Sequence, residues 1–151
     1  MKLKGTKTAE NLLKSFAGES QANRRYTYYA KVARKQGYIQ IADIFEETAD
    51  QESMHAKRFF SFLNEDKELQ GEMLGITAEY PVALYEETLD NLKAAAAGEN
   101  EEWTDLYPEF AKVAREEGFG AIAAAYDKIA EVEARHEKRY RKLIENIETN
   151  T

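Results

Sequence analysis

The sequence predicts an all-α protein, a four-helix bundle with one long crossover between its second and third helices. Helix-favouring Ala, Glu, Lys, Leu and Arg dominate, and the only prolines are Pro81 and Pro108. Apolar residues also recur at alternating steps of three and four, as on the buried face of a helix. The 151 residues suffice for one hydrophobic core, so we expect a single domain over residues 1–151.

Capping residues and glycines set the expected helix boundaries. The four helices are predicted from Thr6 or Thr8 to just before Gly37, from about 38 to 65, from a start between Pro81 and Thr88 to about Gly118, and from about 119 to 148. The short turns at Gly37 and Gly118 make the flanking helices antiparallel neighbours. The segment from about Asp66 to Tyr80 is long enough to cross the bundle.

The chain contains an internal repeat at an offset of 81 residues. Residues 29–60 match residues 110–141 at many positions, among them Ala30, Gly37 and Ile41. The repeat divides the domain into two helical hairpins, over about 6–65 and about 82–148. The second helix of each hairpin carries one Glu-x-x-His motif.

The two motifs, Glu52 with His55 and Glu133 with His136, contain both histidines of the chain. Residues at i and i+3 point to the same side of a helix, so one metal ion can bind the carboxylate and the imidazole together. A single motif of this kind is more often a solvated helix face. Two copies that use every histidine favour a metal site.

Glutamates also interrupt the apolar faces of all four helices. The inward positions predicted to carry them are Glu19, Glu52, Glu99 with Glu102, and Glu133. Burying unpaired carboxylates costs several kcal/mol each, by order of magnitude, and five together would repel one another. Two divalent cations balance them, and oxygen-rich ligation with two imidazoles suits iron or manganese. The alternative is a structural ion-pair network.

The first and third helices differ by one inserted residue. Seven residues separate Glu19 from Tyr26, whereas eight separate Glu99 from Tyr107. An inserted residue in a continuing helix is commonly absorbed as a π-bulge, which we expect between about Asn100 and Tyr107. A simple kink at the following proline is an equal alternative.

Tyr26 and Tyr107 occupy equivalent positions in the repeat, one to two helical turns from the predicted ligands. Each could donate a hydrogen bond to a ligand carboxylate, which would orient the ligand and tune the metal. The alternative is that both are ordinary core aromatics.

Composition excludes several classes of function. The chain has no cysteine, so it forms no disulfide and no thiolate metal site. A net charge of −7 argues against nucleic-acid binding. No apolar signal region or membrane-spanning stretch is present, so we expect a cytoplasmic protein that does not bind membranes.

Several segments resemble the diiron domain of rubrerythrins, a ferritin-like family. These segments are residues 17–22, residues 49–52, residues 97–99 with Glu102, Tyr107 with Pro108, and Glu133 with residues 136–139. The resemblance implies two iron ions, with manganese or zinc as substitutes, bound by Glu19, Glu52, His55, Glu99, Glu102, Glu133 and His136. It further implies that Glu52 and Glu133 bridge the irons, and that Glu102 and His55 exchange at one iron during redox change.

Familiar rubrerythrins continue into a rubredoxin module with four cysteines, which this sequence lacks. The chain is either a member without that module or the first part of a longer protein. Electrons would then come from an external donor such as a rubredoxin-like protein or a reductase. Related proteins also form dimers, so we expect a homodimer, and the crossover could allow it to be domain-swapped.

The function expected from these features is reduction of hydrogen peroxide to water. In this reading Glu102, His55, Tyr26 and Tyr107 assist the reaction. A ferroxidase or iron-handling ferritin-like protein is the first alternative. A structural or interaction bundle without metal is the second.

Overall fold

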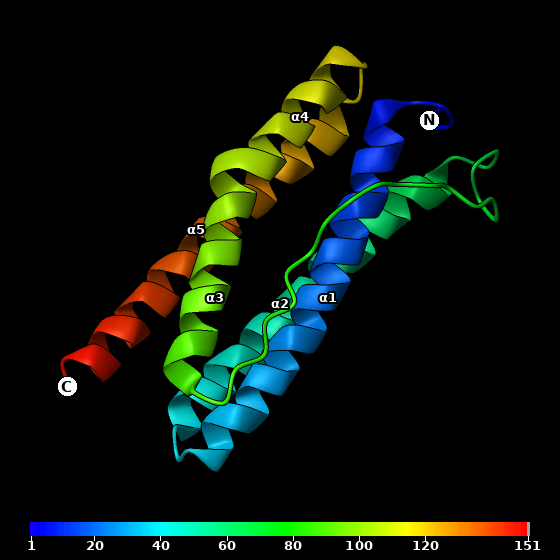
Figure 1. The fold of residues 1–151 in the computed structure, drawn as a ribbon. Helices are drawn as coiled ribbons and strands as arrows, with labels where there is room; N and C mark the ends of the chain where they lie inside the picture. The colour runs from blue at the N-terminus through cyan, green and yellow to red at the C-terminus, as the bar shows by residue number, and fades with distance from the viewer. Residues whose placement is uncertain (151) are drawn as a thin grey trace.

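A computed structural model describes residues 1–150 of the chain as a bundle of long helices (Figure 1). Its elements are α1 (Lys7–Lys35), α2 (Ile39–Glu65), α3 (Thr88–Glu101), the π-helical segment η1 (Glu102–Leu106), α4 (Tyr107–Glu116) and α5 (Gly120–Glu148). Because α3, η1 and α4 follow one another without a break, they form the third helix of the bundle. The predicted four-helix fold with one long crossover is therefore confirmed.

The helix boundaries follow local chemistry. Thr6 caps α1, because its side-chain oxygen accepts a hydrogen bond from the backbone N–H of Ala9 at 3.1 Å. Gly37 and Gly118 both have a φ of +87°, a left-handed conformation that glycine adopts without strain. These two turns reverse the chain, so that α1 packs along α2, and α3 and α4 pack along α5.

The third helix begins at Thr88, at the end of the predicted range from Pro81 to Thr88, so the crossover continues beyond Tyr80 to residue 87. It leaves α2 at Asp66, forms a turn over residues 67–71, and runs in extended form beside α1 to the start of α3 (Figure 1). Tyr80 anchors it by donating a hydrogen bond of 2.7 Å to the carbonyl of Lys14. Tyr29 donates a hydrogen bond of 2.6 Å to the carbonyl of Ala83.

The predicted π-bulge is confirmed and spans Glu102–Leu106. It ends immediately before α4, whose first turn contains Pro108. Proline has no backbone N–H, so the helix lacks one hydrogen bond next to the wider turn. The inserted residue is thus absorbed by a wider helical turn, and the alternative of a simple proline kink is not needed.

The hydrophobic core consists of two clusters. One contains Tyr26, Tyr29, Phe45 and Tyr140, and the other is built around Leu12, Phe59, Tyr107, Ile122 and Tyr126. The inward glutamates belong to neither apolar cluster, although their neighbours along each helix do. Within residues 1–150, no helix has the length and apolar character required to cross a bilayer.

Candidate metal centre

Four helices bring acidic side chains into the interior of the bundle. Glu19 comes from α1, Glu52 from α2, Glu99 from α3 and Glu133 from α5, and each is at most 1 % exposed. Each lies on the same helical face as core residues, which is why folding buries it. The interior therefore holds four carboxylates at the centre of a small protein.

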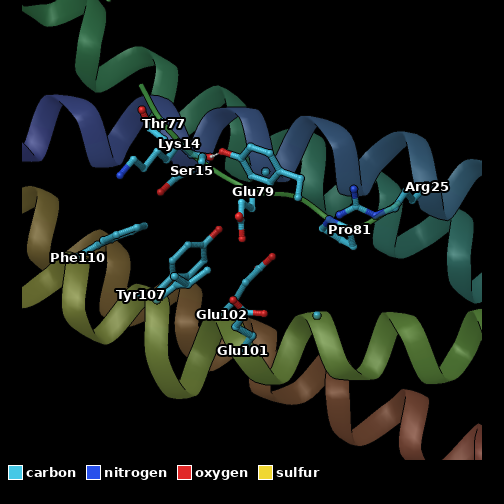
Figure 2. Close-up of a pocket in the computed structure, with 15 residues that line it drawn as sticks. Lys14, Ser15, Arg25, Thr77, Glu79, Pro81, Glu101, Glu102, Tyr107 and Phe110 are labelled. Atoms are coloured by element: carbon cyan, nitrogen blue, oxygen red, sulfur yellow. Dashed lines mark hydrogen bonds between the residues drawn. The ribbon is translucent and has the colours of Figure 1, made fainter. Parts of the chain in front are cut away.

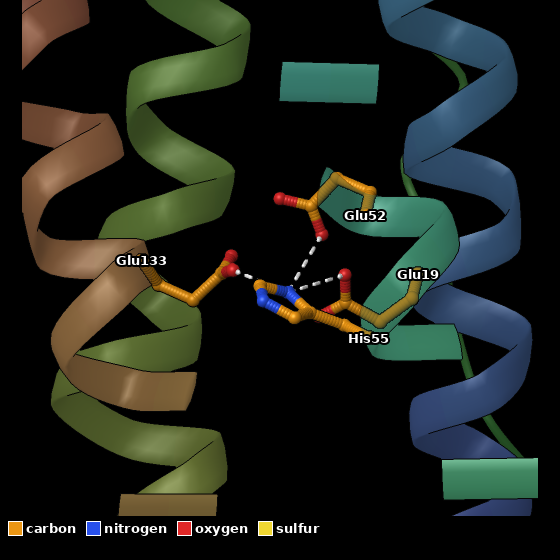
Figure 3. Close-up of side chains that lie close together, drawn as sticks. All are labelled: Glu19, Glu52, His55 and Glu133. Carbon is orange, nitrogen blue, oxygen red and sulfur yellow. Dashed lines mark ion pairs between the residues drawn. The ribbon is translucent and has the colours of Figure 1, made fainter. Parts of the chain in front are cut away.

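The two histidines complete two groups of potential metal ligands. One group contains Glu19, Glu52, His55 and Glu133, and these side chains converge from α1, α2 and α5 in Figure 3. The other contains Glu52, Glu99, Glu133 and His136. Within each group, one ligand atom from every residue lies within 4.8 Å of the others.

Both imidazoles direct Nδ1 at the carboxylates. His55 Nδ1 lies 3.3 Å from Glu133 Oε1 and 3.6 Å from Glu19 Oε2. His136 Nδ1 lies 3.3 Å from Glu52 Oε1 and 3.5 Å from Glu99 Oε1. Each imidazole thus serves one group, whereas Glu52 and Glu133 belong to both groups and are placed to bridge two metal ions.

Many polar atoms of these side chains are buried and have no hydrogen-bond partner. Buried site atoms without a hydrogen-bond partner are Oε2 of Glu19, Glu99 and Glu102, both carboxylate oxygens of Glu52 and Glu133, and Nδ1 of His55 and His136. Buried polar atoms are nearly always paired in proteins, so such a concentration requires an explanation. Two divalent cations would satisfy these lone pairs and balance the negative charge. The residues fit a dimetal centre.

Glu102 is the one predicted ligand that lies in neither group. It begins η1, is half-buried, and lines a pocket beside the site. It remains close enough for the charges of Glu99 and Glu52 to act on its pKa. In the structure, His55 and not Glu102 is therefore the fourth member of the group that contains Glu19, Glu52 and Glu133.

The two tyrosines make the hydrogen bonds that the repeat predicted. Tyr26 Oη donates to Glu99 Oε1 at 2.7 Å, and Tyr107 Oη donates to Glu19 Oε1. Each bond joins one hairpin to a carboxylate of the other. The tyrosines thereby occupy one oxygen of each terminal glutamate and leave the second oxygen free for a metal.

The chain is similar in sequence to proteins of one known family. The sequence model of the rubrerythrin family matches residues 10–144. Rubrerythrin-1 of Clostridium acetobutylicum is 62 % identical over 98 % of this chain and 75 % of its own length. The chain belongs to the rubrerythrin family. Its fold matches that of fully reduced, all-ferrous nigerythrin with a TM-score of 0.81 and 34 % identity, covering 97 % of this chain and 72 % of nigerythrin.

A second structural neighbour extends the relationship to ferritin-like proteins. The bacterioferritin of Desulfovibrio desulfuricans, solved with its diiron site in different catalytic states, has a TM-score of 0.81 and 25 % identity, over 95 % of this chain and 81 % of that protein. Family membership together with the two ligand groups assigns a diiron site to this chain. Iron is the metal that these comparisons support.

Burial and mutual repulsion govern the protonation of the metal-free site. Burial, reinforced by the charges of Glu52 and Glu99, holds the pKa of Glu133 well above its usual range. Burial and the charge of Glu52 also raise the pKa of Glu99. For Glu52, burial alone would raise the pKa, but the two imidazoles beside it outweigh burial and lower it.

His136 shows the converse balance. Burial disfavours its charged form, but contact with Glu52 and Glu99 outweighs burial and raises its pKa to about 9. The metal-free site therefore carries protons that cations would displace on binding.

Gln51, which no sequence pattern marked as part of the site, orients His136. The side-chain oxygen of Gln51 accepts a hydrogen bond from His136 Nε2, which leaves the Nδ1 lone pair for a metal. No periodic signal marked Gln51, because its partner lies on another helix. Its position directly before a ligand glutamate was the only available signal.

Proposed function

We propose that the protein is a non-haem diiron peroxidase that reduces hydrogen peroxide to water. The observation that carries the proposal is the pair of ligand groups that share Glu52 and Glu133, beside a pocket lined by an acidic side chain that belongs to neither group. Shared carboxylates would hold two metal ions close together. When bound, two ferrous ions would supply the two electrons needed to break an oxygen–oxygen bond and Lewis-acid contact with the oxygens.

The protein's own residues have three tasks in this reaction. Tyr26 and Tyr107 hold the terminal glutamates in fixed orientations through their hydrogen bonds. Apolar side chains on either side of the carboxylates exclude bulk water. Glu102 lines the pocket beside the metal ligands, so its carboxyl group is placed to pass a proton to a departing oxygen.

The experiment that tests this function is anaerobic stopped-flow mixing of the ferrous protein with peroxide or with dioxygen. We expect peroxide to oxidise both irons rapidly, at one peroxide per iron pair, and dioxygen to react slowly. A faster reaction with dioxygen would contradict the peroxidase and favour an oxidase.

The second candidate is a ferroxidase or iron-handling protein, in which iron passes through the site as substrate. The similarity to bacterioferritin favours it. Retention of iron during repeated turnover distinguishes the two, since a peroxidase keeps its two irons whereas a ferroxidase releases ferric product. Radioactive iron loaded before turnover and counted afterwards on the protein gives the answer.

We further propose that electrons reach the site from an external partner, such as a rubredoxin-like protein or a reductase. A depression on the α2–α5 side is lined by both imidazole rings together with Met54, Arg135 and Arg139, so a donor at this surface would lie next to two ligands. A cytoplasmic homodimer remains part of this proposal.

A further inference from the structure

A pocket of about 310 Å³ lies next to the metal centre, and neither histidine is among its lining residues (Figure 2). It is enclosed by α1, by residues 77–81 of the crossover, and by the third helix around η1. Glu102 and Tyr107 line the side that meets the metal centre, where Tyr107 donates its hydrogen bond to Glu19. A molecule in this pocket would therefore lie beside the metal ligands.

The pocket is much larger than hydrogen peroxide requires. One water molecule occupies about 30 Å³ in the liquid, and peroxide has only one more oxygen atom. Sites for organic small molecules begin at about 300 Å³. The volume next to the metal centre thus matches a small organic molecule.

The lining has a polar end and an apolar side. The polar end consists of Glu102 and the hydroxyl-bearing ring of Tyr107, whereas Leu106, Phe110 and Pro81 provide apolar surface. The other charged side chains of the lining are Lys14, Arg25, Glu79 and Glu101, so that positive and negative residues nearly balance (Figure 2). The matching ligand has a polar head at the metal centre and a small, uncharged, apolar tail.

We propose that the protein also reduces small alkyl or aryl hydroperoxides, with the organic group held in this pocket. This inference rests on the proposed peroxidase function. The oxygen–oxygen bond of ROOH breaks as it takes up two electrons and two protons, which yields ROH and water. When bound, two ferrous ions would supply the two electrons and become ferric, and solvent would supply the two protons.

Gly98 keeps part of this space open. It lies within α3 and lines the pocket, and a Cβ atom added to it would meet no atom within 4 Å outside its own helical turn. A larger side chain there would occupy the pocket without displacing a neighbour, and it would favour the helix by up to about 1 kcal/mol. By contrast, a Cβ on Gly18 would contact the ring of Tyr80 at 3.4 Å.

The test compares two oxidants in the iron-loaded protein and in the variants Gly98→Ala and Gly98→Leu. We expect the native protein to reduce both tert-butyl hydroperoxide and hydrogen peroxide. The ratio of kcat/KM for the organic oxidant to that for hydrogen peroxide should fall slightly in Gly98→Ala and about tenfold or more in Gly98→Leu. Gly120→Leu, at an exposed position at the start of α5, is the matched control and should leave the ratio unchanged.

A binding measurement on the metal-free protein provides a readout independent of turnover. Addition of tert-butanol, the product alcohol, should shift the NMR signals of Leu106 and Phe110 in the native protein but not in Gly98→Leu. The inference is overturned if the native protein reduces hydrogen peroxide alone, or if Gly98→Leu lowers both rates equally. Failure with both oxidants would instead reject the peroxidase function itself, and this inference with it.

Discussion

The two helical hairpins carry the same Glu-x-x-His motif but differ in the helix that precedes it. In the first hairpin, α1 runs unbroken past Glu19, so that a single carboxylate faces the centre. In the second, α3 ends two residues after Glu99, η1 follows it, and Glu102 lines the pocket. A duplicated scaffold thus yields two similar halves of a metal site, of which only one has an additional acid next to a pocket.

Substitution of a shared ligand should give the largest effect. Glu52→Ala removes a carboxylate that belongs to both ligand groups, so the purified protein should lose both irons. Peroxidase activity should fall by about three orders of magnitude or more, because metal contact contributes several kcal/mol. Glu19→Ala affects one group only and should retain about one iron per chain. Elemental analysis measures both.

Glu47→Ala is the matched control for this prediction. Glu47 lies on the same helix, but it is exposed and pairs with Arg139 at 3.2 Å. The Glu47→Ala variant should therefore retain two irons. If Glu52→Ala also retained two irons, the claim that Glu52 binds both metal ions would be contradicted.

Removal of the π-bulge should convert the second hairpin into a copy of the first. Deletion of the exposed residue Thr104 restores the seven-residue spacing found between Glu19 and Tyr26. We expect the loss of the π-turn to move Glu102 relative to the pocket. We expect iron to be retained and peroxide reduction to slow by about a hundredfold, the effect of misplacing a catalytic group. Rapid-mixing kinetics measure the rate.

Deletion of Met73, which is fully exposed in the crossover, controls for shortening the chain by one residue. It should leave the rate close to native. A native rate in the Thr104 deletion would show that the bulge has no part in the reaction.

Loss of the tyrosine hydroxyls should have a smaller effect. Tyr26→Phe and Tyr107→Phe each remove one hydrogen bond to a terminal glutamate while keeping the aromatic ring in the core. Iron affinity should fall by about 10- to 100-fold in each variant. Competition with a chelator measures it. An unchanged affinity in both would mean that these residues are only core aromatics.

The smallest effect concerns the stability of the metal-free protein. Raised pKa values of Glu99, Glu133 and His136 mean that the folded chain binds more protons than the unfolded chain between about pH 4.5 and 9. The free energy of unfolding should therefore fall as pH rises across this interval, although the lowered pKa of Glu52 opposes the trend.

Replacing one carboxylate should reduce this pH dependence. Glu133→Leu removes a buried acid and its repulsion, so it should stabilise the metal-free protein by about 1–4 kcal/mol at neutral pH. Urea titrations at several pH values measure both quantities. If the free energy of unfolding of the metal-free native protein rose steadily with pH, the claim that its folded site binds extra protons would be contradicted.

Much of the fold could be predicted because its signals are local. Gly37 and Gly118 marked the turns, Thr6 marked the first cap, and one inserted residue marked η1. The inward position of Glu133 followed from helical periodicity alone. These features depend on spacing along one helix, which the sequence records directly.

Contacts between distant segments could not be predicted in the same way. Gln51 meets His136 from another helix, and Tyr80 packs on Gly18 from an extended segment without periodicity. The sequence also gave no sign that Glu102 would lie outside both ligand groups, because a π-turn changes the direction of a side chain by an amount that spacing does not define.

Anaerobic titration of the metal-free protein with ferrous iron tests the central claim most directly, namely that two cations stabilise the buried carboxylates. The account predicts saturation at two irons per chain in the native protein, with proton release on binding. In Glu52→Ala, tight binding should be lost. Saturation at one iron or fewer in the native protein, or the same titration in Glu52→Ala, would contradict it.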